Sequence, residues 1–175
     1  GETGHQTAVR ALVLYPMNAL VDDQLMRMRR ALDSDDARNW LRQNRMGHRF
    51  YFGRYTGATP VTGNRDTKQA RERLQQELQA TEARGRRAAE VALESGDPSA
   101  QFFVPRLDGG EMRSRWDMID APPDILVTNY SMLNVMLLRD RDSHFFDSTR
   151  AWLGSDPTHR FTLVVDELHM YRGTA

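Results

Sequence analysis

Two adjacent carboxylates follow the last apolar run of the sequence. Residues 161–166 read FTLVVD, Glu167 comes next, and His169 lies two positions further on. A carboxylate at the tip of a buried strand can hold Mg²⁺ through water, and a second carboxylate can orient or deprotonate the water that attacks a γ-phosphate. Asp166 fits the first role and Glu167 the second. His169 could connect a nucleotide site to a nucleic-acid site by hydrogen bonding.

Polar groups of another kind follow three other apolar runs. They are Asn18 after residues 9–15 (VRALVLY), Arg54 and Gly57 around the end of residues 50–55 (FYFGRY), and Thr128 and Asn129 at the end of residues 124–128 (DILVT). Hydroxyl groups, amides and backbone N–H groups bind phosphate oxygens without reading base sequence. Ligands of an open α/β sheet bind beyond the carboxyl ends of its strands. The pattern therefore predicts contacts with a nucleic-acid backbone.

Each of these residues also has an ordinary structural explanation. An Asp-Glu pair after a strand can cap a helix, Asn18 can do the same, and Gly57 can be a turn glycine. The appearance of suitable groups after all four runs, in order along the chain, favours the functional interpretation.

The four apolar runs predict a parallel sheet, because near-continuous apolar runs are typical of strands buried on both faces. We expect the strands to end at one edge, at Tyr15, Tyr55, Thr128 and Asp166. The apolar spacing of Val21, Leu25, Met28 and Leu32 predicts an amphipathic helix after the first strand, and Trp40 and Leu41 belong to a second helix. The expected core contains Leu12, Leu14, Leu25, Met28, Leu126, Val127, Val164 and Val165.

Residues 62–120 form an expected insertion between the second and third strands. Residues 65–94 mix basic and acidic side chains at helical spacing, which predicts a solvent-exposed helix broken near Gly85, or a helical hairpin. Residues 101–105 (QFFVP) are expected to form a short edge strand before a turn at Gly109 and Gly110.

The composition excludes several classes of protein. The chain has 175 residues, 24 basic and 24 acidic side chains and no cysteine, which excludes disulfide scaffolds, cysteine zinc sites and thiol nucleophiles. No apolar run is long enough for a membrane helix and no signal peptide is recognisable, so we expect a cytoplasmic protein without a membrane partner. Lys68 is followed by Gln69, so the sequence lacks the Gly-Lys-Ser/Thr of a phosphate-binding P-loop.

Four segments resemble motifs of superfamily 2 helicases. Residues 11–24 (ALVLYPMNALVDDQ) resemble motif Ia, residues 55–59 (YTGAT) the glycine motif, and residues 123–133 (PDILVTNYSML) motif Ib. Residues 163–173 (LVVDELHMYRG) resemble the Walker B motif of the DExH type. The Tyr-Arg-Gly ending is similar to that of large bacterial DExH proteins of the DNA repair and phage-defence kind.

The resemblance implies that residues 1–175 are part of a first RecA-like domain. Such a domain has an α/β fold with a parallel sheet flanked by helices; here it would lack the P-loop strand and helix and carry the charged helical insertion. The implied activity is that of an ATP-dependent helicase that binds ATP and Mg²⁺ and moves along nucleic acid, with DNA preferred over RNA. A second RecA-like domain of the same longer chain is the expected partner, and the 175 residues alone are expected to be inactive.

Motif positions assign roles to individual residues by the same resemblance. Asp166 would hold Mg²⁺ through water, Glu167 would be the catalytic base, and His169 would couple the two sites. The implied contacts with the nucleic-acid strand are Pro16, Asn18, Gly57, Thr128 and Asn129, with Arg54 nearby.

Three other functions compete with a helicase. Asp66 and Lys68 form an Asp-x-Lys pair of the kind found in metal-dependent nucleases, but no apolar strand flanks them. A non-catalytic RecA-like module that binds nucleic acid or serves as a scaffold would need no P-loop. A zinc hydrolase is disfavoured, because no second histidine lies four residues from His169.

Overall fold

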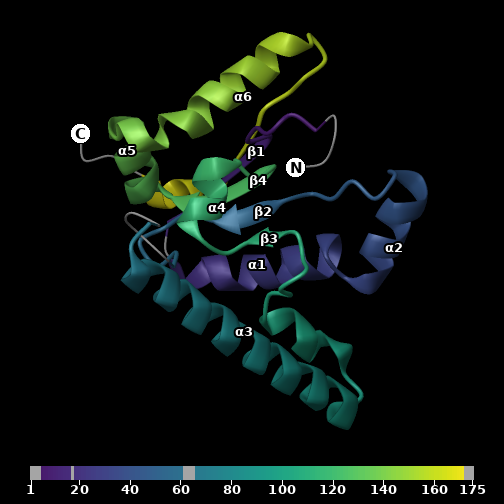
Figure 1. Ribbon diagram of the computed structural model, residues 1–175. Coiled ribbons are helices and arrows are strands. Elements are labelled where there is room, and N and C mark those ends of the chain that lie inside the picture. Colours follow the sequence, from purple (N-terminus) through teal and green to yellow (C-terminus); the bar gives the residue numbers. More distant parts are fainter. Residues whose placement is uncertain (1–4, 17, 61–65, 172–175) are drawn as a thin grey trace. The chain divides into compact units, whose positions relative to one another are not determined.

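The structure is a computed structural model that describes residues 5–16, 18–60 and 66–171 (Figure 1). The chain divides into two compact units. The sheet unit comprises residues 1–22, 50–59 and 112–175, and the helical unit comprises residues 23–49 and 60–111. Most of the expected insertion, residues 62–120, therefore belongs to the same unit as residues 23–49, which follow the first strand.

A five-stranded sheet organises the sheet unit. Its strands are β1 (Ala11–Tyr15), β2 (Phe52–Arg54), β3 (Glu111–Met112), β4 (Ile125–Asn129) and β5 (Thr162–Val165). Their order across the sheet is β3-β2-β4-β1-β5. Strand β1 pairs in parallel with both β4 and β5, and β2 pairs in parallel with β4. The predicted α/β fold with a parallel sheet is confirmed, and it is consistent with a RecA-like domain.

The register of the sheet brings the strand ends together. Tyr15 lies opposite Asn129, and Arg54 lies opposite Val127. Beyond the last paired residues, the Tyr55 N–H donates to the Val127 carbonyl at 2.8 Å and the Asp166 N–H donates to the Leu14 carbonyl at 3.0 Å. The four polar segments therefore follow strands that end at the same edge, as the sequence predicts.

Helices pack on the sheet within the same unit. They are α4 (Arg115–Asp120), α5 (Tyr130–Leu138) and α6 (Ser143–Ser155); the unit also contains the short 3₁₀ turns η2 (Asp140–Asp142) and η3 (Leu168–Tyr171). Met118, Met136 and Phe145 bring α4, α5 and α6 into the core. A hydrophobic cluster joins them to the strands and consists of Val9, Leu12, Leu14, Tyr55, Met118, Leu126, Met136 and Phe145. Gly53 in β2 permits close packing, because a Cβ there would lie 2.8 Å from both the Met112 carbonyl oxygen and the Met118 sulfur.

The helical unit contains α2 (Asp35–Asn44), α3 (Lys68–Ser95) and the 3₁₀ helix η1 (Pro98–Phe103), together with most of α1 (Asn18–Leu32). Side chains cap α2 and α3 at their start: the Ser34 hydroxyl accepts from the Ala37 N–H, and the Thr67 hydroxyl from the Ala70 N–H. Helix α3 ends at Gly96, whose φ of 68° is the left-handed conformation that glycine adopts readily. The second predicted helix is confirmed by α2.

Two predictions about the insertion are wrong. Helix α3 runs through Gly85 without a break, and residues 101–103 belong to η1 rather than to a strand. The local reason for η1 is its start, where the Asp97 carboxylate accepts from the Ser99 N–H at 2.9 Å and Pro98 supplies a fixed φ. The edge strand of this region is instead β3, which follows Gly109 and Gly110.

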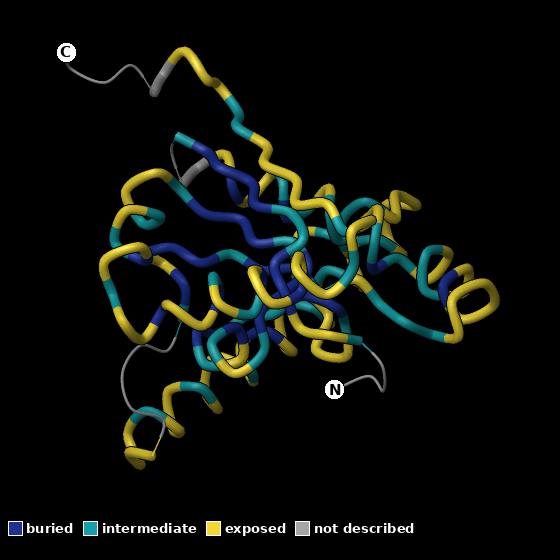
Figure 2. Tube along the Cα trace, turned by 90° about the horizontal axis from the view of Figure 1, so that it is seen from above, coloured by how far each residue is buried: buried dark blue, intermediate teal, exposed yellow. Residues whose placement is uncertain are grey.

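The predicted core is correct for the central strands and wrong for Val164 in β5, whereas Val165 packs against the core cluster. Leu12, Leu14, Leu25, Leu126 and Val127 are buried, whereas Val164 is 44% exposed and Met28 and Val165 are only partly buried. Strand β5 is the outermost strand beside β1, so only one of its edges is paired within the described sheet. In Figure 2 much of the tube that leads toward the C-terminus has the colour of exposed residues, in agreement with the exposure of Thr162, Leu163 and Val164.

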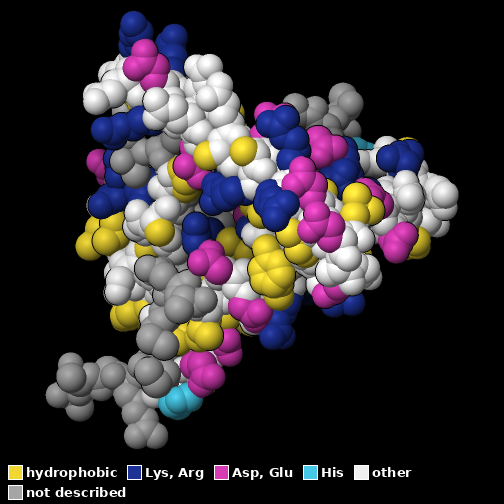
Figure 3. Space-filling view, turned by 90° about the horizontal axis from the view of Figure 1, so that it is seen from below, with side chains coloured by type: hydrophobic (Ala, Val, Ile, Leu, Met, Phe, Trp, Pro, Cys, Tyr) yellow, Lys and Arg dark blue, Asp and Glu magenta, His cyan; other side chains and the backbone are white. Residues whose placement is uncertain are grey.

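The surface carries charges of both signs. Figure 3 shows arginine side chains interspersed with Asp and Glu on one face of the molecule, in agreement with the net charge of zero. None of the described helices combines the length and the apolar character needed to span a membrane.

Candidate functional site

A tight turn follows β5 and carries the predicted catalytic residues. The Asp166 carboxylate accepts a hydrogen bond from the Glu167 N–H at 3.0 Å, and η3 begins at Leu168. The His169 Nδ1 lies 3.2 Å from the Glu167 carboxylate. The His169 side chain is 64% exposed and the Glu167 side chain 48% exposed. The turn therefore presents all three predicted groups at the carboxyl end of the strand, in contact with one another.

Glu167 holds an unusual backbone conformation. Its φ of 50° lies in the left-handed region, which costs an L-residue on the order of 1–2 kcal/mol. The hydrogen bond between its own N–H and the Asp166 carboxylate stabilises this conformation. Strain of this kind collects at functional sites, where it fixes the direction of a reactive side chain.

The residues of this turn suit one particular mode of Mg²⁺ binding. Across the described ranges, no group of three or more His, Asp and Glu side chains could enclose a metal ion. Mg²⁺ commonly binds through one or two carboxylates together with water and substrate phosphates. Asp166 at a partly exposed strand end fits that mode, while the sequence supplies no Gly-Lys-Ser/Thr for the phosphates.

The loop after β2 has a defined shape. The Thr56 N–H donates to the Thr59 hydroxyl at 2.9 Å, and that hydroxyl donates to the Arg54 carbonyl at 2.6 Å. The Ala58 N–H donates to the Thr56 hydroxyl at 3.2 Å. We call residues 54–59 the glycine loop. These hydrogen bonds fix its shape around Gly57.

Nothing in the described protein requires a glycine at position 57. A Cβ built there would have no heavy atom within 4 Å, and the backbone φ lies outside the left-handed region. The missing side chain therefore leaves open space beside the backbone, where a group from outside the chain could approach closely.

Two predicted strand contacts have structural roles in β4. Thr128 is fully buried, and its hydroxyl donates to the Tyr55 carbonyl at 2.6 Å. The Asn129 side chain caps α5 by accepting from the Met132 N–H at 2.8 Å. These bonds join the ends of β2, β4 and α5. Contact of either side chain with nucleic acid stays a prediction.

The remaining predicted contacts lie around β1 and β2. Arg54 pairs with Asp22 at 2.6 Å, and the Arg54 side chain is 25% exposed. Pro16 is partly buried directly after β1. Asn18 is the first residue of α1, and its side chain lies outside the described residues. Met17, Arg172 and Gly173, which belong to the motif-like segments, also lie outside them.

A buried polar group behind the glycine loop was missed by sequence reasoning. The Tyr55 hydroxyl donates to the Asp142 carboxylate at 2.6 Å, and the Arg115 guanidinium lies 5.1 Å from the centre of the Tyr55 ring. Arg115 also donates to the Thr56 carbonyl at 2.6 Å. Burial and the hydrogen bond to Asp142 raise the pKa of the Tyr55 phenol. A tyrosine that ends a buried strand needs a partner for its hydroxyl, and this was the available signal.

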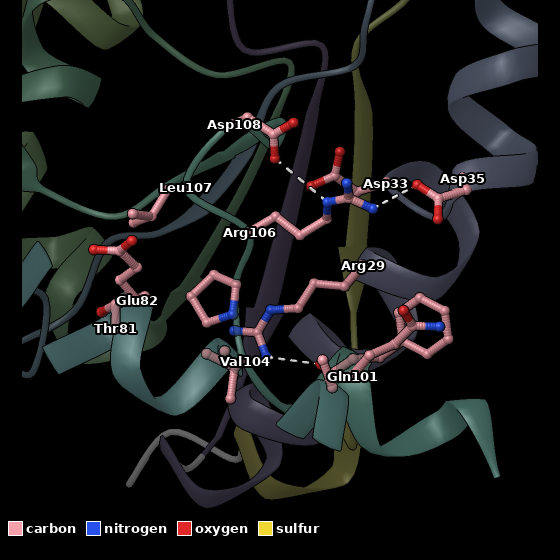
Figure 4. Close-up of a pocket in the computed structure, with 14 residues that line it drawn as sticks. Arg29, Asp33, Asp35, Thr81, Glu82, Gln101, Val104, Arg106, Leu107 and Asp108 are labelled. Atoms are coloured by element: carbon pink, nitrogen blue, oxygen red, sulfur yellow. Dashed lines mark hydrogen bonds and ion pairs between the residues drawn. The ribbon is translucent and has the colours of Figure 1, made fainter. Parts of the chain in front are cut away.

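The helical unit contains a separate pocket of about 540 Å³. Figure 4 shows Arg106 in it between Asp35 and Asp108, and these ion pairs fix the pocket wall. Asp33 also lines the pocket and is buried; one carboxylate oxygen accepts from the Gly110 N–H at 3.1 Å and the other has no partner among the described residues. Burial raises the Asp33 pKa, while Gly110 and neighbouring arginines oppose the rise.

The nuclease alternative gains no support from the geometry. Lys68 begins α3 and is 91% exposed, with Glu72 at 3.7 Å as its partner. Asp66 lies 3.8 Å from Arg71 at the same helix end. The pair lies at the exposed N-terminus of α3 rather than at a strand end.

Comparisons with known proteins give one informative match. The chain is 32% identical to Druantia protein DruE of Escherichia coli (strain UMEA 4076-1) over 200 aligned positions, which cover 94% of this chain. The chain spans 11% of the length of that relative. No protein-family profile and no solved structure matches the sequence. A match over 94% of the chain is too extensive to omit residues 62–120, so it includes the charged insertion as well as the strands.

Proposed function

We propose that this chain is part of an ATP-dependent nucleic-acid helicase or translocase of the DExH type. The observation that carries the proposal is the shared edge: β1, β2, β4 and β5 end side by side, and each strand ends in or directly before a segment that resembles a helicase motif. Strand ends of an open parallel sheet are where α/β proteins bind ligands.

The turn after β5 would serve nucleotide hydrolysis. Asp166 would hold Mg²⁺ through water, and Mg²⁺-ATP would supply the phosphate under attack. Glu167 would orient and deprotonate the attacking water, and its strained backbone and its contact with His169 support a fixed position for the carboxylate. The phosphate-binding lysine would come from another part of a longer protein.

The glycine loop and its neighbours would contact the nucleic-acid strand. The open space at Gly57 supports a close approach of a phosphate to the backbone, and Arg54 supplies a positive charge within the same loop region. Pro16, Asn18 and Asn129 complete the proposed set by motif position, and the buried Thr128 would support it by holding the end of β2 through the Tyr55 carbonyl. These contacts position a strand without reading its sequence.

The biological setting is proposed from the similarity to a Druantia protein. That match supports the phage-defence side of the resemblance to large bacterial DExH proteins, and the 11% coverage of the relative supports a longer parent chain. We propose DNA and a second RecA-like domain of that parent as partners.

The glycine loop provides the experiment that tests strand binding. The chain should bind a fluorescein-labelled oligothymidylate, measured by fluorescence anisotropy, with an affinity that falls as salt rises. Gly57→Ala should weaken binding about tenfold or more, because it blocks a hydrogen bond to a charged phosphate worth roughly 1.5–3 kcal/mol. Its effect on the free energy of unfolding should be small, since a Cβ meets open space.

Gly154→Ala is the matched control. Gly154 lies in α6, and a Cβ there also has no heavy atom within 4 Å. Replacing a helical glycine by alanine should raise the free energy of unfolding by about 0.5–1 kcal/mol and leave binding unchanged. Equal affinities for the two variants would remove the glycine loop from the proposed interface.

A non-catalytic strand-binding module is the second candidate, favoured by the absence of Gly-Lys-Ser/Thr from these 175 residues. The two candidates differ in the longer protein. There, Glu167→Gln should abolish ATP hydrolysis and spare ATP binding if the chain is catalytic. An ATPase rate unaffected by Glu167→Gln would favour the non-catalytic module.

A further inference from the structure

The sheet unit encloses a carboxylate whose position simple packing does not explain. Tyr55 and Asp142 are both completely buried and share a hydrogen bond of 2.6 Å. The second oxygen of Asp142 has no partner among the described residues, and the same is true of the Arg115 Nε. Burying incompletely paired charges lowers stability. A buried group that is incompletely paired calls for an explanation, and a role for its geometry elsewhere in the molecule is one.

The feature that depends on it is the backbone of the glycine loop. Arg115 donates to the Thr56 carbonyl at 2.6 Å, and its guanidinium also covers the Tyr55 ring at 5.1 Å. On the other side, the Tyr55 hydroxyl is fixed by Asp142, at the junction of η2 and α6. Tyr55 and Thr56, the two residues before Gly57, are therefore held in place by three contacts: the Tyr55 hydroxyl with Asp142, the Tyr55 ring with Arg115, and the Thr56 carbonyl with Arg115.

We propose that Asp142 and Arg115 are positioning residues for nucleic-acid binding, acting through Tyr55 and Thr56 on the Gly57 backbone. This inference rests on the proposed function of the glycine loop. Arg115 is only 6% exposed, so its guanidinium acts from within the protein and makes no contact with phosphate. Asp142 has no access to solvent and acts through the Tyr55 hydroxyl alone.

The test compares affinity with stability. Tyr55→Phe keeps the ring and removes the hydroxyl, and we expect the affinity of the chain for oligothymidylate to fall about two- to tenfold, the effect of one hydrogen bond. Asp142→Asn keeps an acceptor for the hydroxyl and should retain most of the affinity. If Tyr55→Phe fails to fold, Arg115→Met keeps the test decisive, because it removes the hydrogen bond to the Thr56 carbonyl and should lower the affinity.

Thr149→Val is the control for a purely structural role. The buried Thr149 hydroxyl accepts from the Val9 N–H at 3.0 Å and donates to the Phe145 carbonyl at 2.7 Å, so neither of these bonds involves a residue of the glycine loop. Thr149→Val should lower the melting temperature by an amount comparable to Tyr55→Phe and leave the affinity unchanged. Equal affinities of the Thr149→Val and Tyr55→Phe variants would overturn the inference.

Salt dependence separates positioning from direct contact. Arg115→Met should lower the affinity and leave the slope of log K against log salt unchanged, because no phosphate contact is lost. A slope reduced by about one unit would show that Arg115 touches phosphate and would overturn its positioning role. If the unchanged chain does not bind oligothymidylate, both the proposed strand binding by this loop and the positioning role fail. If the unchanged chain binds, the variants test the positioning role alone.

Discussion

The ion pair between Arg54 and Asp22 gives the most specific prediction about strand binding. The two side chains meet at 2.6 Å, and Asp22 is 71% exposed. A phosphate that binds Arg54 must compete with this carboxylate. Asp22→Asn removes the competitor while keeping the size of the side chain, so we expect the affinity for single-stranded DNA to rise.

The size of the gain follows from the exposure of the pair. Exposed ion pairs contribute about 0.2–1 kcal/mol, which corresponds to an increase in affinity of roughly 1.4- to 5-fold at 25 °C. Salt screens exposed charges, with a Debye length of about 10 Å at 0.1 M and 3 Å at 1 M. The gain should therefore be largest at low salt and should shrink as salt rises.

Asp23→Asn is the matched control for the change in net charge. Asp23 is the next residue along the chain and pairs with Arg27 at 2.9 Å. Both variants raise the net charge by one, so only the gain of Asp22→Asn beyond that of Asp23→Asn reports on Arg54. Fluorescence anisotropy with labelled oligothymidylate measures both affinities under the same conditions.

The Arg54→Ala background completes the test. Arg54→Ala alone should reduce the slope of log K against log salt by about one unit if Arg54 contacts phosphate. In the Arg54→Ala background, Asp22→Asn should raise the affinity no more than Asp23→Asn does, because there is no Arg54 for it to free. A full gain from Asp22→Asn in the absence of Arg54 would refute the assignment of Arg54 to the interface.

Three further predictions address other parts of the molecule. Thr128→Val should lower the free energy of unfolding by about 1–3 kcal/mol in urea titrations, because the buried Tyr55 carbonyl loses a donor; an unchanged urea midpoint would contradict this. The hydrogen bond from Arg38 lowers the Asp108 pKa to about 2, so Asp108→Asn should destabilise the chain at pH 7, by less than about 1 kcal/mol for this exposed pair. In thermal melts that deficit should shrink as pH falls from about 4 to about 2, where the native carboxylate also becomes protonated, whereas a constant deficit would contradict the shift. The 175-residue chain should show no ATP hydrolysis in a phosphate-release assay, and hydrolysis that disappears with Glu167→Gln would overturn this.

The strands of the central sheet could be predicted from sequence because their environment is uniform. A strand between two others in a parallel sheet is covered on both faces, so its sequence is apolar almost throughout, as in LVLY of β1 and ILV of β4. Parallel order then places all strand ends at one edge, which is why Tyr55 and Asp166 could be expected there together. The apolar pattern of β5 predicts the same environment, but the described sheet leaves its outer edge unpaired and Val164 exposed.

Features that depend on contacts between residues far apart in the sequence could not be predicted in this way. Asp142 lies 87 residues from Tyr55 along the chain, and its sequence context of charged residues resembles a surface turn. Gly85 suggested a helix break because glycine is unfavourable inside helices by about 1 kcal/mol. In the structure, a Cβ at Gly85 would lie 4.0 Å from the Val104 side chain, so α3 packs closely against the residues after η1 at this point. Packing of that kind compensates for a poor local preference.

Thr128 shows that the polar groups at this edge of the sheet have different roles. From sequence, its hydroxyl and the amide of Asn129 were equivalent phosphate ligands; in the structure, the first bonds to the Tyr55 carbonyl and the second caps α5. Strand-end side chains thus hold the ends of β2, β4 and α5 together. The open space that remains adjoins the backbone at Gly57, with Arg54 as the neighbouring charge. Backbone and arginine contacts recognise phosphate rather than base edges, so this division of groups favours a site that follows a strand irrespective of its sequence.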